Sequence, residues 1–433
     1  MNFRFMRCAA IALVGFGASF GVSASVQAES LQETISALLK SHQRIQAAKA
    51  DVASAGEGFH VARKAYLPTL DITAFYGFEE QRKHESDDTH MPTRELDFKV
   101  TQLVYDFGST LIGKEQAELA VTQAEVILDA TQQGLILEAL SAHLGLISAN
   151  EIVNFAKGSE ANIKRQTELE DARVQRGSGF STDVLQAKAQ LAGAQARRVQ
   201  AEGALHQARY RYQAVFGVAP EKITGLKKPR VPLDLLPGSM EAAVDMALNS
   251  SKQLEVTQIV SDVARAQTKK ARADGLFPVI NLIGENKLKK DNGGTVGFKG
   301  EQIIRLEATY SFNLWGSSLN TIEASKHAYL ASSSRVMDAK NIISEQVRAA
   351  WQQLQTSREN AQFLRNQANI ASEFLELARK ERRLGRRSLI DVLAGETALI
   401  NASSDAASAE SNISVAAFTL LGVMGTLNLD AIQ

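Results

Sequence analysis

The chain has 433 residues, enough for several ordinary domains or for one elongated domain. Only 6% of the residues are aromatic and only 7 are proline, a composition typical of long helices. Its 48 basic residues balance 48 acidic residues, so the net charge gives no electrostatic reason to bind nucleic acid.

The N-terminus has the pattern of an export signal. Arg4 and Arg7 precede an uncharged run, 8–22, and Val26-Gln27-Ala28 forms a small-x-small cleavage site. We therefore expect residues 1–28 to be a removed signal peptide. The alternative is a buried N-terminal helix, which the glycines of the run would weaken.

Cysteine usage agrees with export. Cys8 is the single cysteine, and it would leave with the signal, before most of the apolar run. It therefore does not have the position of a lipid-acceptor cysteine, and the mature chain would hold no thiol, disulfide or cysteine-based metal site. No stretch of about 20 apolar residues follows, so a membrane would have to be crossed by strands.

The chain contains an internal repeat with a separation near 208 residues. The segment RGSGFSTDVLQAKAQL at 176–191 corresponds to LGRRSLIDVLAGETAL at 384–399. Four of the seven prolines lie between the halves, which indicates a linker there. The predicted segments are a first repeat at 29–217, a linker or equatorial segment at 218–238, a second repeat at 239–425 and a C-terminal tail at 426–433.

Each half should contain the same elements in the same order. A helix of roughly 35 residues is followed by two strands, a very long helix, a glycine turn and another helix. The first helices are predicted at about 30–66 and 240–275, the strand pairs at about 67–107 and 278–315, the long helices at 108–175 and 316–383, and the turns near 176–183 and 384–391. Apolar residues recur every seven positions in both long helices, which predicts coiled-coil packing over about 100 Å.

The strands alternate apolar and polar side chains. In 303–314, Ile304 and Leu306 would lie on one face and Arg305 and Glu307 on the other. This pattern fits a half-buried soluble sheet or the wall of a membrane barrel, and a length of about ten residues suits a membrane crossing.

Strand number favours a trimer if the sheet lies in a membrane. Four strands cannot close a barrel, and an open sheet would leave unpaired backbone groups in lipid. Two copies would give eight strands, too few for a channel, whereas three copies would give twelve.

These features together resemble the TolC family of outer-membrane factors. The similarity covers essentially the whole mature chain, including KVTQLVYDFG where a strand leads into the long helix, and the paired G-x5-D-V segments at the tips. The resemblance implies a mainly α fold with a membrane β part: a trimeric 12-stranded outer-membrane β-barrel continued by a periplasmic α-helical coiled-coil barrel.

The same resemblance implies a function and partners. The chain would be a non-enzymatic, cofactor-free exit duct in the outer membrane, extending into the periplasm. It would work as a homotrimer with a periplasmic adaptor (membrane fusion) protein and an inner-membrane transporter, either ABC-type or proton-driven. Type I protein secretion is slightly favoured over multidrug efflux. A periplasmic coiled-coil adaptor or scaffold without its own channel is the alternative.

The hairpin tips carry the candidate site. Gly177 and Gly385 permit chain reversal. Asp183 and Asp391 fall in the first turn of the following helices, where Ser388 can cap one helix and Asp183 can cap the other. Both acids could simply complement the helix dipoles, or they could form charged rings around a tunnel.

Family resemblance assigns roles at these tips. It implies a periplasmic gate of Thr182, Asp183, Arg387 and Asp391. For the tip turns and adaptor docking it implies Gly177, Val184, Leu185, Gly385, Val392 and Leu393. The sequence departs from the family pattern at Arg382, where a tyrosine is expected, and at Ala394, where an acid is expected.

Two other sequence patterns could indicate a nucleotide-binding or a metal-binding protein, and both support those functions less well than the features above support an export duct. The segment 108–114 resembles a phosphate-binding loop before a helix, but Glu115 follows where a Mg²⁺ ligand should be Ser or Thr. The acids and histidines of 84–90 could bind a metal, although a solvated strand-to-strand loop explains them as well. No catalytic constellation stands out.

Overall fold

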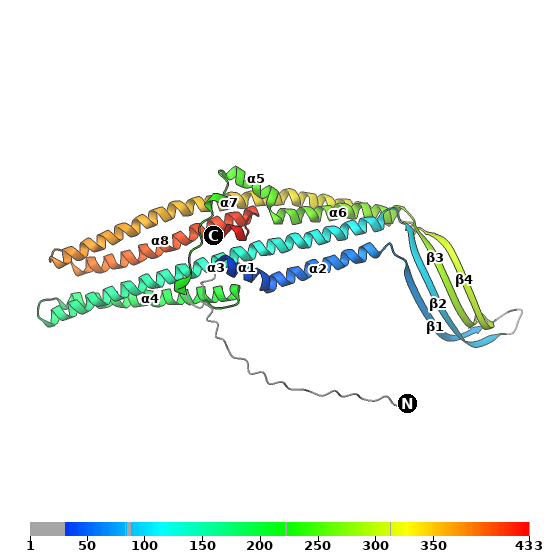
Figure 1. Ribbon diagram of the computed structural model, residues 1–433, viewed down its shortest axis with the longest axis horizontal. Helices are drawn as coiled ribbons and strands as arrows, with labels where there is room; N and C mark the ends of the chain where they lie inside the picture. Colours follow the sequence, from blue (N-terminus) through cyan, green and yellow to red (C-terminus); the bar gives the residue numbers. More distant parts are fainter. Residues whose placement is uncertain (1–30, 83, 85–87, 221–222, 312, 433) are drawn as a thin grey trace, which may run out of the picture.

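The computed structural model describes residues 31–82, 84, 88–220, 223–311 and 313–432. The predicted signal peptide at 1–28 lies outside the described residues. The molecule is elongated, with a β-sheet at one end and two helical hairpin tips at the other (Figure 1). Its helices are α1 (Leu31–Ser41), α2 (Gln43–Lys64), α3 (Ser109–Gln175), α4 (Ser181–Phe216), α5 (Met240–Ser250), α6 (Lys252–Leu276), α7 (Ser317–Arg383) and α8 (Leu389–Met424).

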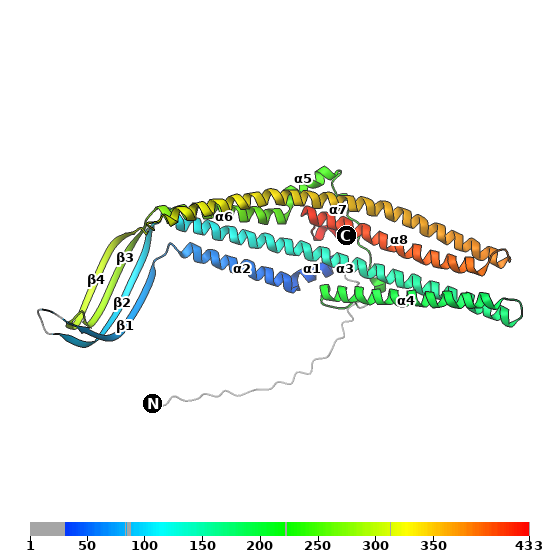
Figure 2. The same ribbon diagram turned by 180° about the vertical axis from the view of Figure 1, so that it is seen from behind.

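Two continuous helices run most of the length of the molecule. α3 and α7 have 67 residues each, as their heptad pattern predicts, which corresponds to about 100 Å. Shorter helices accompany them: α2 and α6 run beside them towards the sheet, and α4 and α8 run beside them towards the tips (Figure 2). Each repeat therefore supplies one continuous helix and two half-length partners.

The first helix of each repeat is broken, contrary to the single 35-residue helix expected. His42 has an extended backbone between α1 and α2, and its Nδ1 accepts a hydrogen bond from the Arg44 amide at 3.1 Å. Ser251 separates α5 from α6 at the corresponding place and caps α6. At this break Gly425 lies directly against the backbone of Ser250 and Ser251. A Cβ at position 425 would come within 2.3 Å of the Ser250 carbonyl oxygen.

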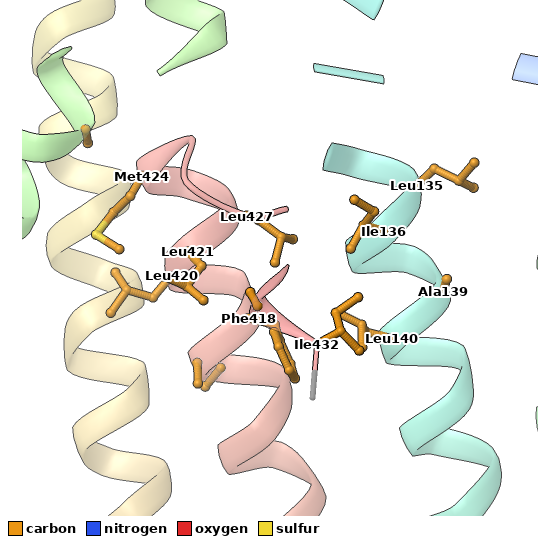
Figure 3. Close-up of a cluster of buried hydrophobic side chains, with 14 of the residues drawn as sticks. Leu135, Ile136, Ala139, Leu140, Phe418, Leu420, Leu421, Met424, Leu427 and Ile432 are labelled. Atoms are coloured by element: carbon orange, nitrogen blue, oxygen red, sulfur yellow. The ribbon is translucent and has the colours of Figure 1, made fainter. Parts of the chain in front are cut away.

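A hydrophobic core near the middle of the molecule, a level that we call the waist, holds the two repeats together. It joins α1, α3, α5, α7 and α8 with the C-terminal turn, and its largest fully buried side chain is Phe418 (Figure 3). Leu135 of α3 and Ile343 of α7, both members of the heptad pattern, are buried in it. α3 and α8 contain windows apolar enough to span a membrane, but 61% and 56% of those windows are buried here, so burial in this core accounts for their composition.

The linker crosses this waist and is fixed to α3. It contains two short 3₁₀ turns, Ile223–Gly225 and Leu233–Leu235. The ring of His143 on α3 makes a 2.9 Å hydrogen bond to the Lys227 carbonyl oxygen, and Lys228 forms an ion pair with Glu151 at 2.8 Å. Burial lowers the pKa of His143, so the imidazole is held neutral and its Nε2–H donates.

The strands form one antiparallel sheet in the order β1-β2-β3-β4. They are β1 (Thr69–Gln81), β2 (Thr89–Tyr105), β3 (Val279–Asn292) and β4 (Thr295–Thr309). The two strand pairs of the repeat meet at β2 and β3, where Asp97 pairs with Lys287 in the register. The expected strand at 303–314 is shifted: β4 starts and ends earlier, residues 310–316 lead into α7, and Phe312 is outside the described residues.

The two faces of the sheet differ as the alternation predicts. Ile304 and Phe298 lie on one face, which we call the outer face, and each is 84% exposed. On the opposite face, which we call the inner face, Arg305 forms ion pairs with Glu285 and Glu307, both at 2.9 Å. One face therefore presents apolar side chains without cover, while the other carries a network of charges.

Candidate functional site: the hairpin tips

Both tips reverse the chain with the same backbone motif. Gly177 has φ +75° and Gly385 has φ +72°, conformations that side-chain-bearing residues rarely adopt. The Gly177 amide donates to the Val174 carbonyl at 2.9 Å, and the Ser178 amide to the Arg173 carbonyl at 3.0 Å. This pair of bonds is a Schellman motif.

The second tip repeats this motif 208 residues later. The Gly385 amide donates to the Arg382 carbonyl at 3.0 Å, and the Arg386 amide donates to the Glu381 carbonyl at 2.9 Å. Both glycines are therefore placed as the sequence predicts, and the repeat extends to individual hydrogen bonds.

The helices that leave the tips are capped differently. Ser388 caps α8, because its hydroxyl accepts a hydrogen bond from the Asp391 amide at 3.2 Å. The N-cap of α4 is Phe180, which has no side-chain capping bond. The prediction that Asp183 caps α4 is therefore wrong: it lies in the first turn, where a carboxylate still favours the helix dipole.

The predicted gate residues are not all brought together within one chain. Thr182 and Asp391 are exposed and Asp183 is half-buried. Arg387 forms its ion pair with Glu381, at 2.8 Å, and its guanidinium lies 5.2 Å from the ring centre of Phe374. Any bond between Asp183 and Arg387 would therefore need a second copy of the chain or a different conformation.

Of the predicted docking residues, three are covered. Val184, Val392 and Leu393 are buried, and the last two belong to apolar clusters that pack α8 against its neighbours. Their role in adaptor docking therefore stays a prediction, and in this conformation it would be indirect. Leu185 is 67% exposed and stays available to a partner.

Two buried carboxylates, which the sequence analysis missed, connect the hairpins. Glu170 on α3 accepts hydrogen bonds from Arg382 on α7 and from Arg173, both at 2.8 Å. Arg382, the residue that departs from the family pattern, also donates to the carbonyl oxygen of Arg387 at 3.3 Å. One arginine therefore joins α7 to α3 and to the turn that carries the gate residue.

The second carboxylate lies one level further from the tip. Glu396 on α8 is 2% exposed, pairs with Arg379 on α7 and accepts a 3.5 Å hydrogen bond from Asn162 on α3. We call these two contact sets, Glu170–Arg382 and Asn162–Glu396–Arg379, the hairpin latch. Glu170–Arg382 and Asn162–Glu396 link the α3–α4 hairpin directly to the α7–α8 hairpin, and a 3.4 Å hydrogen bond from the Arg197 guanidinium on α4 to the Thr397 hydroxyl on α8 adds a further link nearby.

Each of these two acids has a feature in the sequence that predicts a paired carboxylate. Glu170 lies near the C-terminal end of α3, where the helix dipole disfavours an anion and a cationic partner is required. Glu396 occupies a position in the apolar stripe of α8 that also contains Leu389, Leu393 and Ile400. A carboxylate in such a stripe must be paired when it is buried.

The latch borders a basic cavity of about 430 Å³ between α3 and α7. Its charged lining residues are Arg165, Glu170, Arg173, Glu376, Arg379, Lys380, Arg382 and Arg383. The Lys380 ammonium holds the pKa of Glu376 below its usual value through a hydrogen bond. The excess of arginine makes this surface suited to an acidic partner segment.

The competing sites do not form in the described residues. At the start of α3, the Asp106 carboxylate accepts hydrogen bonds from the amides of Gly108 and Thr110, at 3.1 and 2.6 Å. These are the donors that a phosphate would need. In the loop weighed for metal binding, Glu85 and Asp87 lie outside the described residues, and the rest of the described chain holds no cluster of three potential metal ligands.

Comparison with known proteins agrees with the duplicated architecture. The model of the outer membrane efflux protein family matches twice, at residues 34–218 and 243–426, one match in each repeat. The chain belongs to this family. The resemblance to TolC is confirmed: the chain is 26% identical over 414 residues to the outer membrane protein TolC of Vibrio cholerae, covering 94% of this chain and 93% of that protein.

Two further comparisons, one of sequence and one of fold, agree with this assignment. The chain is 24% identical over 357 residues to the alkaline protease secretion protein AprF of Pseudomonas aeruginosa, covering 80% and 71% of the two proteins. The CmeC outer membrane channel of Campylobacter jejuni has the same fold, with a TM-score of 0.79, 14% identity, and coverage of 92% and 86%. The chain is thus an outer-membrane export channel protein and not an enzyme, which leaves no place for the alternative of an adaptor without a channel.

Proposed function

We propose that this protein is the exit duct of a tripartite export system, working as a homotrimer. The proposal rests on the four-stranded sheet, whose edge strands β1 and β4 have no further strand partner within the described chain. In lipid each open edge would leave unpaired backbone groups at a cost of several kcal/mol apiece. Three copies pairing β4 with the next β1 give twelve strands and remove every edge.

The helices supply the second half of the duct. α3 and α7 continue from the sheet for about 100 Å, a length that extends well beyond a bilayer of about 30 Å into the periplasm. Three copies would line a tunnel with six hairpins whose tips converge at its inner end. An adaptor protein and an energised inner-membrane transporter would engage these tips to deliver cargo.

The tips would then form a gate. Thr182, Asp183 and Arg387 would bond between neighbouring hairpins of the closed trimer, as family resemblance suggests. Asp391 is exposed in the first turn of α8, so three copies would form an anionic ring. Such a ring attracts cations and repels anions without contributing contacts to closure.

Adaptor docking would use the exposed part of the tip. Leu185, Leu384 and Ile390 are exposed apolar residues there, beside the arginine-lined cavity between α3 and α7. An adaptor hairpin with apolar side chains and an acid would match this surface in shape and charge. The buried residues Val392 and Leu393 would support it from beneath.

For cargo, we favour type I protein secretion slightly over multidrug efflux. AprF, by its name a protease secretion protein, is similar over most of this chain, and the similarity to TolC covers nearly all of it. The family model itself is described by efflux, so both substrate classes occur among relatives.

Mass measurement and electrophysiology test the proposal. Detergent-solubilised protein should have the mass of three chains and should form cation-preferring channels in planar bilayers. Asp391→Ala should reduce the cation preference with little change in conductance. A stable monomer, or a trimer that never conducts, would exclude the duct. The transporter that co-purifies from membranes would then decide between secretion and efflux.

A further inference from the structure

One row of side chains crosses all four strands on the outer face of the sheet. The register aligns Tyr76 of β1 with Arg94 of β2, Arg94 with Lys290 of β3, and Lys290 with Phe298 of β4. The Arg94 guanidinium lies 5.5 Å from the ring centre of Tyr76, and the Lys290 ammonium lies 5.1 Å from that of Phe298. The row is therefore aromatic, cation, cation, aromatic.

The level of this row corresponds to a membrane boundary. Along β4 the outer face runs from Ala308, beside the helices, to Phe298, about ten residues further. At about 3.3 Å per residue and a strand tilt near 40°, that distance is about 25 Å in height. An outer-membrane barrel has an apolar band of about 25 Å. The row therefore lies at the outer edge of the band, where lipid headgroups begin.

The two cations of the row have no ion-pair partner among the described residues. On the inner face Lys289 pairs with Glu95 and Glu301, at 3.4 and 3.5 Å. Within the described residues no carboxylate comes within ion-pair distance of Arg94 or Lys290. Their Cα atoms are direct cross-strand partners, and like charges opposite one another destabilise a sheet. An anion bound between them would relieve this repulsion.

We propose that Arg94 and Lys290 bind the phosphate of a lipid headgroup in the outer leaflet of the outer membrane. Arg94 offers a planar fork suited to a phosphate, and Lys290 adds a second cation beside it. The rings of Tyr76 and Phe298 lie against the two cationic groups and would face the acyl chains. The trimer would carry three such sites around the barrel, and the ligand class is a phosphorylated glycolipid such as lipid A.

Lipid titration of the purified full-length trimer tests the site. Three probes are added to protein in neutral detergent: lipid A with two phosphates, the same lipid without phosphate, and inorganic phosphate. The wild type should bind the bisphosphorylated lipid, and Arg94→Gln/Lys290→Gln should raise the Kd about tenfold or more. The dephosphorylated lipid and inorganic phosphate should bind far more weakly to both proteins.

Two matched variants distinguish this site from general electrostatics and from a folding role. Lys99→Gln/Lys299→Gln removes the same charge from the inner face of β2 and β4 and should leave the Kd unchanged. Arg94→Lys/Lys290→Arg keeps both charges and should retain binding within about threefold. The proposal is overturned if the inner-face variant loses as much affinity, if inorganic phosphate displaces the lipid at equal concentration, or if Arg94→Gln/Lys290→Gln binds as well as the wild type.

Discussion

The hairpin latch should control how easily the tips separate. Arg382→Gln removes the cation that connects α7 to Glu170, a carboxylate that is 4% exposed. At 2.8 Å and an effective dielectric constant of about 20, the gross attraction of this pair is about 6 kcal/mol. Desolvation offsets much of it, and Arg173 stays beside Glu170 as a second cation.

The expected net loss of closed-state stability is therefore about 1–3 kcal/mol, which corresponds to a shift of about 5-fold to 150-fold towards open tips. Single-channel recording in planar bilayers should show this as a higher mean conductance. Glu170→Gln should act in the same direction, because it leaves Arg382 without its partner. Each variant must first run as a stable trimer in detergent.

A double-mutant cycle separates the latch from unrelated effects. Glu170→Gln/Arg382→Gln should cost less than the sum of the single changes, with a coupling of about 1 kcal/mol or more. Arg383→Gln is the control, since it removes a neighbouring, exposed cation from the same helix end and should leave conductance unchanged. Unaltered conductance in both single variants, or equal effects of Arg382→Gln and Arg383→Gln, would refute the reasoning.

Three more outcomes follow from the geometry. Asp183→Ala/Arg387→Ser should raise single-channel conductance modestly, because exposed ion pairs contribute little, and no change would assign closure to the latch alone. Ile304→Arg should impair outer-membrane assembly by about 2–4 kcal/mol while Ile303→Arg on the inner face should not; equal yields of folded trimer would show that the outer face does not meet lipid. Because burial lowers the pKa of His143, the unfolded chain binds a proton that the folded chain does not, so thermal stability should fall as the pH drops below about 6.5. Melting curves of His143→Gln should show a smaller fall, and an identical pH dependence would contradict this origin.

Periodicity predicted the large elements because it depends on burial along whole faces. The bounds of α3 and α7 agree with prediction to within a residue, since a glycine directly precedes each helix and another lies two residues after its last residue. The breaks at His42 and Ser251 were missed because local capping decides them, together with the contact of Gly425 at the second break, and neither changes the apolar pattern.

The site was predicted less completely for a different reason. A single sequence shows that Gly385 must turn and that Asp391 starts a helix, because both depend on neighbours in the chain. It does not show that Val392 faces inwards or that Arg382 reaches Glu170 across 212 positions. Those facts depend on which helix faces which, and this pairing becomes visible only in the folded hairpins.

The breaks in the first helix of each repeat affect how the tips can move. Among the described helices, only α3 and α7 continue through the waist, so we expect each to pivot about the core around Phe418. From Leu140 to the end of α3 the arm is about 50 Å long. A rotation of about 5° at the waist therefore displaces the tip by about 4 Å, more than the length of a hydrogen bond. Small repacking in the core at the waist would thus be enough to separate the latch contacts without any change in the strand register of the sheet.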